Sequence, residues 1–259
     1  MLSIDHVSIQ YKNRQEIVPV IRDLSLQIRQ GEALVILGVS GCGKSTLINA
    51  LAGSIGIESG TVSFVKEQEK QPLNPKLHKI GLIPQNCGLL PWKSVKDNCT
   101  LPLRIRKISV NQAYREEMNR IYEALNIMQI LDNYPNQLSG GQLQRAAIAR
   151  AFILKPDVLL MDEPFSALDA LTREEARELF LSVWKQIRPT TILVTHSIEE
   201  ALYLGNTICV MEEREGKISY HMENPYFGQP HPEDINYLML QKQLRERLKL
   251  TEERRAAGE

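Results

Sequence analysis

The chain lacks features that define several classes of protein. It has four cysteines, Cys42, Cys87, Cys99 and Cys209, and none of them forms the C-x-x-C spacing typical of metal and redox sites. We interpret them as free thiols in a reducing compartment. No apolar run approaches the roughly 18–20 residues that cross a bilayer, and the N-terminus alternates like a strand, not like a signal peptide. Any membrane role is therefore expected to go through a partner.

An excess of charge is also missing. Lys and Arg together number 31, as do Asp and Glu, so the 259-residue chain has a formal net charge of zero. A dedicated nucleic-acid binder usually carries a basic excess, so nucleic acid is not expected as a partner. The chain has no internal repeat, and 43% of its residues are hydrophobic. That is enough for one large domain with a small appendage.

Apolar patterns alternate between those of strands and those of helices. Short apolar runs at 33–37, 158–161 and 192–194 are typical of strands buried on both faces, and residues 5–9 and 21–28 predict two further strands. Residues 66–79 are polar and contain two prolines, so a surface loop is expected there. The alternation predicts an α/β fold with a doubly wound parallel sheet.

Helices are expected from Lys44 to near Gly53 and over about 110–131, where apolar residues recur at helical spacing. The second of these helices is expected to belong to a helical subdomain inserted at about 88–155. Three further helices are predicted to open with capping boxes, at Ser139–Gln142, Thr172–Glu175 and Ser197–Glu200.

The character of the chain changes after about residue 220. Residues 221–232 contain three prolines and two histidines and are expected to form a linker, and residues 233–256 are predicted to be a charged helix. One domain is therefore expected over residues 1–220, with a linker and helical tail over 221–259. Such a tail is more often a solvated helix than a regulatory element.

A phosphate-binding loop follows the apolar run at 33–37. Residues 38–46 match the Walker A pattern G-x-x-x-x-G-K-[ST] between a predicted strand and a predicted helix. Its backbone N–H groups and the helix N-terminus suit the phosphates of a nucleotide. Lys44 is expected to reach the β- and γ-phosphates, and Ser45 to bind Mg²⁺. The predicted contacts are Gly38, Ser40, Gly41, Cys42, Gly43, Lys44, Ser45 and Thr46.

Three polar residues follow other predicted strands. Asp162 and Glu163 end the run at 158–161, where Asp162 suits Mg²⁺ and Glu163 suits the polarisation of an attacking water. The alternative is a helix cap or a solvated edge. His196 follows the strand at 192–194 and is expected to contact the γ-phosphate and orient Glu163, although a lone histidine is more often structural.

A second glycine-bearing motif, Leu138–Arg145, lies about ninety-five residues after the phosphate loop. Ser139 and Gln142 fit a capping box, so one interpretation is a well-capped helix. A further interpretation is that Gly140 and Gly141 leave N-terminal amides open to a phosphate. Because the chain already has one phosphate loop, this second site would serve the γ-phosphate bound by another subunit.

In combination, these motifs resemble those of the nucleotide-binding ATPase subunits of ABC transporters, over about residues 1–220. The resemblance implies a P-loop NTPase core with a parallel-sheet centre, an N-terminal antiparallel part and an inserted helical subdomain. It implies that ATP and Mg²⁺ bind and that two copies form a head-to-tail dimer with ATP between them. The residues that would contact ATP held by the partner copy are Ser139, Gly140, Gly141 and Gln142.

The same resemblance gives roles to residues that are unremarkable by themselves. Tyr11 would stack on adenine, Asp169 would organise the dimer seam, and Gln85 would sense Mg²⁺ and the attacking water and face the membrane subunit. Pro84 stands where the family usually has an aromatic residue. The implied partners are integral membrane permease subunits and, indirectly, an extracytoplasmic solute-binding protein. The implied location is the cytoplasmic face of the cell membrane.

A finer resemblance is to ATPases of bacterial importers for nitrate, aliphatic sulfonates and taurine. It rests on residues 88–95, 164–173 and 195–201, and it does not identify the solute. A soluble ABC ATPase of DNA repair or translation is the alternative, and such proteins usually have two cassettes or long coiled-coil insertions. A nucleotide kinase would not explain residues 138–142. Cys42, beside a helix N-terminus, adds the hypothesis of a redox-sensitive ATPase.

Overall fold

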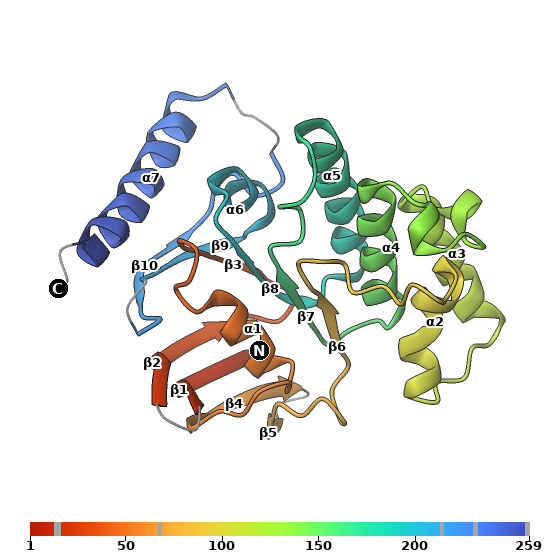
Figure 1. The fold of residues 1–259 in the computed structure, drawn as a ribbon, viewed down its shortest axis with the longest axis horizontal. Coiled ribbons are helices and arrows are strands. Elements are labelled where there is room, and N and C mark those ends of the chain that lie inside the picture. The colour runs from red at the N-terminus through yellow and green to blue at the C-terminus, as the bar shows by residue number, and fades with distance from the viewer. Residues whose placement is uncertain (13–16, 67–68, 213–214, 230–232, 257–259) are drawn as a thin grey trace. The chain divides into compact units, whose positions relative to one another are not determined.

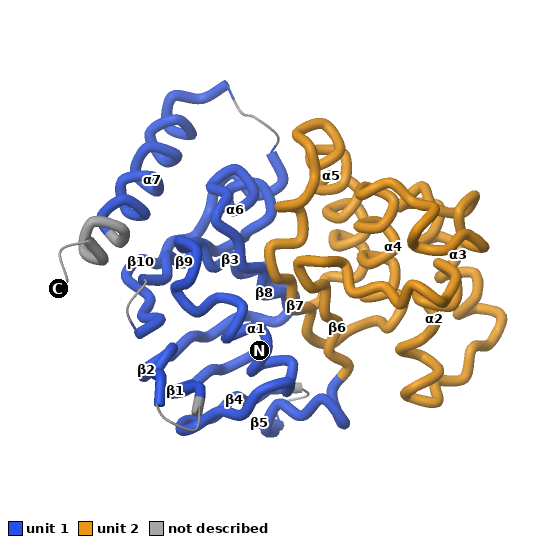
Figure 2. Tube along the Cα trace, viewed as in Figure 1, with its two compact units in different colours: residues 1–78, 190–259 blue, residues 79–189 orange. Residues whose placement is uncertain are grey.

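The computed structural model describes residues 1–12, 17–66, 69–212, 215–229 and 233–256 (Figure 1). The chain divides into two compact units (Figure 2), residues 1–78 with 190–259 and residues 79–189. Within the described ranges, no helix is both long and apolar enough to cross a membrane.

The first unit contains an antiparallel sheet with the strand order β2-β1-β4-β5. Its strands are β1 (Leu2–Lys12), β2 (Ile17–Ile28), β4 (Ser59–Lys66) and β5 (Glu69–Pro72). Ile4, Val7 and Ile21 are fully buried on its inner face. The loop predicted at 66–79 is partly wrong, because β5 pairs with β4 there. All four residues of β5 are exposed, so its sequence has no apolar alternation to indicate a strand.

A second group of strands in this unit has the order β10-β9-β3-β8. Strand β3 lies between β8 and β9 and pairs in parallel with both, while β10 is antiparallel to β9. Helix α1 contacts β8, and α6 contacts β3. These elements are β3 (Ala33–Leu37), α1 (Lys44–Leu51), β8 (Thr190–Thr195), α6 (Ile198–Leu204), β9 (Thr207–Met211) and β10 (Ile218–Glu223). The parallel centre predicted from the buried runs is confirmed.

The second unit has one pair of parallel strands and four α-helices, with two short 3₁₀ helices at Met128–Ile130 and Pro135–Gln137. Phe152, Phe165 and Phe180 are buried together in its core. The other elements are β6 (Ile80–Ile83), α2 (Val95–Ile105), α3 (Gln112–Ala124), α4 (Gly140–Ile153), β7 (Val158–Asp162) and α5 (Ala170–Ile187).

The helix predicted over about 110–131 is shorter in the structure. Helix α3 ends at Ala124 because Asn126 takes a left-handed backbone conformation, with φ of 53°, which an α-helix does not tolerate. The apolar residues beyond it continue the pattern through the 3₁₀ helix at Met128–Ile130. Helix α2, which contains Pro102, was not predicted.

The first residues of α4, α5 and α6 can be compared with the three predicted capping boxes. Ser139 and Gln142 form the predicted reciprocal box at α4, and the Ser197 hydroxyl accepts from the Glu200 amide at 3.3 Å. The box predicted at Thr172 is wrong, because α5 starts earlier, at Ala170, where the Asp169 carboxylate accepts from the Thr172 amide at 3.1 Å. Asp is as good an N-cap as Thr or better, and it stands three residues earlier.

The tail forms helix α7 (Ile235–Ala256), as predicted, and α7 contacts α6. Tyr237 and Leu244 are buried, and the Tyr237 ring packs edge-on against Tyr226. The predicted linker begins inside β10, and its residues 230–232 lie outside the described residues. The predicted domain boundary at residue 220 stays a prediction.

Candidate functional site

The phosphate loop lies in the first unit, between β3 and α1. Gly41 and Gly43 have φ of +92° and +104°, a region that side chains other than glycine rarely adopt. A Cβ on Gly43 would also lie 3.1 Å from the Val20 Cγ1 atom. Gly43 is the N-cap of α1, so the N-terminal amides of α1 follow it directly. The loop thus has the backbone that a phosphate site requires.

The Lys44 side chain folds over the loop from the first residue of α1. Its ammonium donates to the Gly38 carbonyl at 2.9 Å and the Val39 carbonyl at 2.8 Å, and only 5% of the residue is exposed. The Cys42 thiol is buried, and a Cβ on Gly38 would lie 2.7 Å from its sulfur. Among the predicted contacts, Cys42 can therefore offer its backbone but not an exposed side chain.

Tyr11 and His196 also lie next to this loop. The Tyr11 hydroxyl is 3.3 Å from the Thr46 hydroxyl, and the tyrosine is 43% exposed. The Gly38 amide donates to the Thr195 carbonyl at 3.2 Å, so His196 follows the residue that contacts the start of the loop. The Thr195 hydroxyl in turn bonds to the Glu200 carboxylate at 2.6 Å, which fixes the turn that carries His196.

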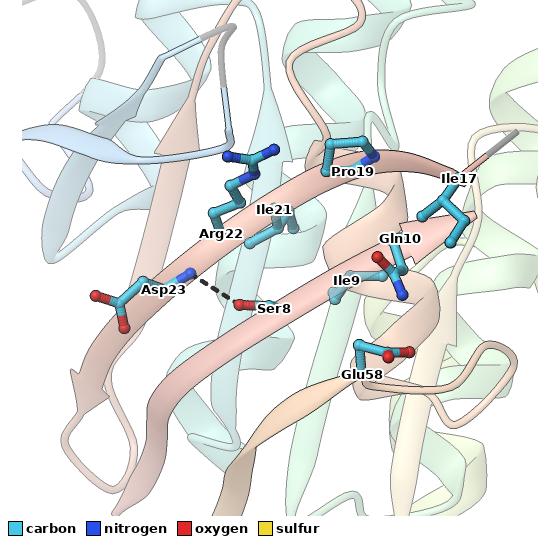
Figure 3. Close-up of a pocket in the computed structure, with 9 residues that line it drawn as sticks. All are labelled: Ser8, Ile9, Gln10, Ile17, Pro19, Ile21, Arg22, Asp23 and Glu58. Carbon is cyan, nitrogen blue, oxygen red and sulfur yellow. Dashed lines mark hydrogen bonds between the residues drawn. The ribbon is translucent and has the colours of Figure 1, made fainter. Parts of the chain in front are cut away.

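A separate hollow of about 420 Å³ lies on strands β1 and β2 (Figure 3). Two acidic residues, Asp23 and Glu58, are among the residues that line it, and Arg22, also in the lining, is paired with Glu215 at 2.9 Å. Two carboxylates repel a phosphate. In the first unit, the loop at 38–46 is therefore the better candidate for a triphosphate.

The carboxylate pair lies in the second unit. Asp162 is the last residue of β7, whose other four residues are buried, and Glu163 follows it. Glu163 has φ of +43°, a left-handed conformation that is strained for this residue. Its carbonyl accepts from the Ser166 amide and from the Ser166 hydroxyl, at 3.2 and 2.9 Å. These bonds hold the backbone that aims the Glu163 side chain.

Asp169 lies at the end of the same loop, as the N-cap of α5. Hydrogen bonds from Thr172 hold the pKa of the Asp169 carboxyl below its usual range. The Arg173 guanidinium, on the first turn of α5, donates to the Phe165 and Leu168 carbonyls. The loop from Glu163 to Asp169 is thus fixed at both ends.

Gln85 lies at the same sheet edge as Glu163. Strands β6 and β7 are parallel, and their last pair is Ile83 with Met161. Gln85 lies two residues after Ile83 and Glu163 two residues after Met161, so both follow the same end of the ladder. Gln85 is exposed, in the turn that begins at Pro84. The Pro84 carbonyl accepts from the Cys87 amide at 3.0 Å, which closes this turn.

The second glycine motif opens α4 in the second unit. The Ser139 hydroxyl accepts from the Gln142 amide at 3.3 Å, and the Gln142 side-chain oxygen accepts from the Ser139 amide at 3.0 Å. Ser139 and Gly140 are exposed. Gly141 is buried, and a Cβ there would lie 2.5 Å from the Thr172 Cγ2 atom. Gly140 can therefore offer its amide to a ligand, and Gly141 also lets α4 pack against α5.

The predicted site residues thus fall into two groups. The first unit brings together Tyr11, residues 38–46 and His196, and the second brings Gln85, Asp162 and Glu163 to one sheet edge and packs residues 139–142 beside the 168–172 segment. Sequence reasoning missed Gln144 and Arg150 on α4, which contact the turn that carries Gln85. A polar Gln144 inside an apolar helical stripe was the available signal.

Comparison with known proteins identifies the family. Residues 21–166 match the family model described as ABC transporter. The taurine import ATP-binding protein TauB of Rhizobium johnstonii is 40% identical over 84% of this chain and 82% of its own length. The aliphatic sulfonates import ATP-binding protein SsuB of Bacillus cereus is 38% identical over 87% of each chain. The nitrate import ATP-binding protein NrtD of Synechococcus elongatus is 39% identical over 74% of this chain and 69% of its own length.

Solved structures show the same fold. The dimeric ATP-binding cassette MJ0796, in a post-hydrolysis state with ADP and Pi, superposes with a TM-score of 0.73, at 29% identity over 86% of this chain and 98% of that chain. The α/β fold with an N-terminal antiparallel sheet and a parallel centre is therefore confirmed. From the family match, the relatives and the fold, we conclude that this chain belongs to the ABC transporter family, as an ATP-binding subunit that hydrolyses ATP.

Proposed function

We propose that the chain drives a membrane importer for a small anion-type solute, of the sulfonate, taurine or nitrate kind. The observation that carries this proposal is the shared function named for three kinds of relative, all of them import ATP-binding proteins, at 38–40% identity over 74–87% of this chain. Solute choice would reside in membrane and solute-binding partners, and this subunit would supply the work of ATP hydrolysis.

The first unit would hold the nucleotide. The triphosphate would lie on the backbone amides of residues 38–46, and Lys44 would leave its carbonyl partners to neutralise the β- and γ-phosphates. Tyr11 is 43% exposed beside Thr46, which suits an adenine ring stacked on the tyrosine face. His196, at the turn next to Gly38, would contact the γ-phosphate.

Mg²⁺ fits the donor set of the predicted site. Ser45 offers an exposed hydroxyl on the first turn of α1, and Asp162 offers a carboxylate at the end of a rigid buried strand. Gln85 adds an amide oxygen at the same sheet edge as Glu163. When nucleotide phosphates complete its coordination shell, Mg²⁺ prefers oxygen ligands and needs only one or two protein carboxylates. The ion would neutralise charge on the transferred phosphoryl group.

Glu163 would polarise the water that attacks the γ-phosphate. Its carboxylate extends from a backbone fixed by Ser166 and by buried Phe165, so the base would be positioned before ATP arrives. Positioning and charge neutralisation are the main sources of catalysis in phosphoryl transfer.

Two copies would share each ATP. Ser139 and Gly140 are exposed at the N-terminus of α4, where an anion is stabilised by the helix dipole and open amides. The related cassette MJ0796 is a dimer. We propose that residues 139–142 of one copy contact the γ-phosphate held by the other, with Asp169 at the seam.

A groove in the second unit suits the membrane subunit. It measures about 560 Å³, lies along α2 and α3, and has an apolar floor that includes Leu103 and Met118. Lys96, Lys107 and Arg115 line it, and none of these three has an ion-pair partner among the described residues. A short segment of the permease with apolar and acidic side chains would complement this charge at the cytoplasmic face of the membrane.

Co-purification from membranes tests the importer proposal. Affinity-tagged chain, isolated from detergent-solubilised membranes of its own cells, is expected to retain integral membrane subunits. The double variant Lys96→Glu/Arg115→Glu is expected to retain less than about a tenth of them, because reversed charges repel an acidic partner. Lys185→Glu, on the exposed face of α5, is the matched control and should retain them fully.

Two results of this co-purification would contradict the importer or its docking surface. Recovery of ribosomes or DNA in place of membrane proteins would support a soluble ATPase, and full retention by the double variant would place the docking surface elsewhere. Uptake of labelled taurine, an alkanesulfonate or nitrate, by cells with and without the chain, then identifies the solute. Unchanged uptake of all three would reject the anion class.

A further inference from the structure

The turn that carries Gln85 is held by one arginine of α4. The Arg150 guanidinium donates one N–H to the Gly88 carbonyl and another, at 2.7 Å, to the Cys87 carbonyl. The two bonds reach successive carbonyls from two nitrogens of one planar fork, whereas a lysine would have to make both bonds from a single nitrogen. Arg150 thus clamps the end of the turn to α4.

The clamped residues have a backbone that needs such support. Cys87 and Gly88 both adopt left-handed conformations, with φ of 61° and 59°, and Cys87 is strained there because it has a Cβ. A Cβ on Gly88 would lie 2.9 Å from the Pro84 Cγ atom. The turn is therefore tight, and it fixes the position of Gln85 only while its carbonyls are held.

The hydrogen bonds of Arg150 hold a positive charge in a partly desolvated position, which is unfavourable for the charged form. Burial lowers the pKa of the Arg150 guanidinium, and no carboxylate pairs with it in the part of the chain that the structure describes. The nearby Cys99 thiol is neutral, since burial raises its pKa to about 12. Arg150 is half-buried, and a partly desolvated cation without an ion pair is uncommon unless its hydrogen bonds have a purpose. Here both bonds that the structure gives it go to the turn.

A second side chain of α4 supports the same turn. The Gln144 side-chain oxygen accepts from the Cys87 thiol at 3.0 Å, and Gln144 is only 1% exposed. Helix α4 begins at Gly140, about 15 Å along the helix axis from Arg150 at 1.5 Å per residue. One rigid helix therefore carries the motif offered to the partner copy at its start and the clamp on the Gln85 turn near its end.

We propose that Arg150 is a positioning residue for ATP hydrolysis, because it holds the Gln85 turn in register with α4. This inference rests on the role proposed for Gln85 at the Mg²⁺ site. Arg150 would act through the Gln85 turn and not by a contact of its own with ATP. Its hydrogen bonds keep Gln85 in place and make the Gln85 turn move together with α4.

The test is Arg150→Lys in the full chain, which keeps the charge and removes the fork. We expect kcat for ATP hydrolysis to fall about tenfold while KM for ATP stays within about twofold, the pattern of a lost contribution to the transition state. Alkylation of Cys87, followed by peptide mass spectrometry, should become several-fold faster. The retained charge keeps its effect on the Cys87 thiol, so the rate reports exposure. Arg120→Met, on the exposed face of α3, is the control.

A double variant separates positioning from a general structural role. If Arg150 acts through Gln85, Gln85→Ala/Arg150→Lys should be no slower than Gln85→Ala alone. Losses that multiply would overturn the proposal, as would wild-type kcat and Cys87 alkylation in Arg150→Lys. Arg150→Gln, which leaves no charge at this position, gives the same comparison if the lysine variant folds poorly.

Failure of the two proposals can be told apart. If Gln85→Ala keeps wild-type kcat, the proposed role of Gln85 is wrong, and faster Cys87 alkylation in Arg150→Lys would then show a clamp without a catalytic purpose. If Gln85→Ala is slow and Arg150→Lys is not, only the positioning role of Arg150 is wrong.

Discussion

At the scale of single residues, the site stores strain where the chemistry is proposed. Glu163 has φ of +43°, and a non-glycine residue in this region costs about 1–3 kcal/mol. The strain persists because Ser166 bonds to the Glu163 carbonyl and Phe165 is fully buried behind it. A carboxylate held in this way needs little reorganisation when a water molecule arrives.

Removal of the Glu163 charge tests its role as the base. Glu163→Gln keeps the shape of the side chain, so ATP affinity should stay within about twofold, while kcat should fall about 100-fold or more because a positioned general base contributes that much. Uncleaved ATP should then trap a dimer that size-exclusion chromatography detects.

Glu199→Gln, on the exposed first turn of α6, is the matched control and should hydrolyse ATP normally. Near-normal turnover by Glu163→Gln would assign the base to another residue.

At the scale of elements, the N-terminus of α4 has a cap, and we propose that it also binds a phosphate held by the partner copy. Ser139 and Gln142 satisfy each other in a capping box, which alone would explain both residues. The same box leaves Ser139 and Gly140 exposed, where a phosphate of the partner copy could bind. Stability and ATP-driven dimerisation should therefore respond differently to substitutions at Ser139.

Two substitutions at Ser139 separate these purposes. Ser139→Ala removes the cap and should lower the free energy of unfolding by about 1 kcal/mol. Ser139→Asp keeps a good cap, so urea unfolding should be close to that of the wild type, but its carboxylate would repel a γ-phosphate. In the Glu163→Gln background, Ser139→Asp should lose the ATP-dependent dimer. A dimer of normal affinity would place residue 139 away from the phosphate.

At the scale of the whole molecule, the tail is packed and not merely appended. Tyr237 and Leu244 of α7 are buried, and Arg247 lies over the Tyr220 ring, 4.9 Å from its centroid. The Tyr226 hydroxyl donates to Asp234 at 2.7 Å. The solvated helix expected from the sequence thus has one face that belongs to the core of the first unit.

Truncation measures what this face contributes. A chain that ends at Gly228 keeps β10 whole and should lose about 3 kcal/mol or more, since burial of each large apolar side chain contributes about 1.5–3 kcal/mol. Its Tm should fall by about 6–12 °C. A chain that ends at Leu250 keeps Tyr237 and Leu244 and should unfold like the full chain. Equal Tm values for both truncations would show that the buried face of α7 adds no stability.

The strands that are buried on both faces and the loop at 38–46 follow from the sequence alone. Continuous apolar runs have no alternative to burial, and the spacing of Gly38, Gly43 and Lys44 specifies a backbone that only a few residue types can adopt. The box at Ser139 was also predictable, because a capping box depends on residues three positions apart.

Features that depend on residues far apart in the chain became clear only from the fold. Strand β5 is polar and exists because β4 offers it a ladder of hydrogen bonds. The N-cap of α5 is Asp169 and not the predicted Thr172, because the loop that begins at Glu163 places the Asp169 carboxylate at the start of the helix. The Arg150 clamp joins residues 62 and 63 positions apart. No local pattern encodes it, because only the fold brings the Arg150 guanidinium to the two carbonyls.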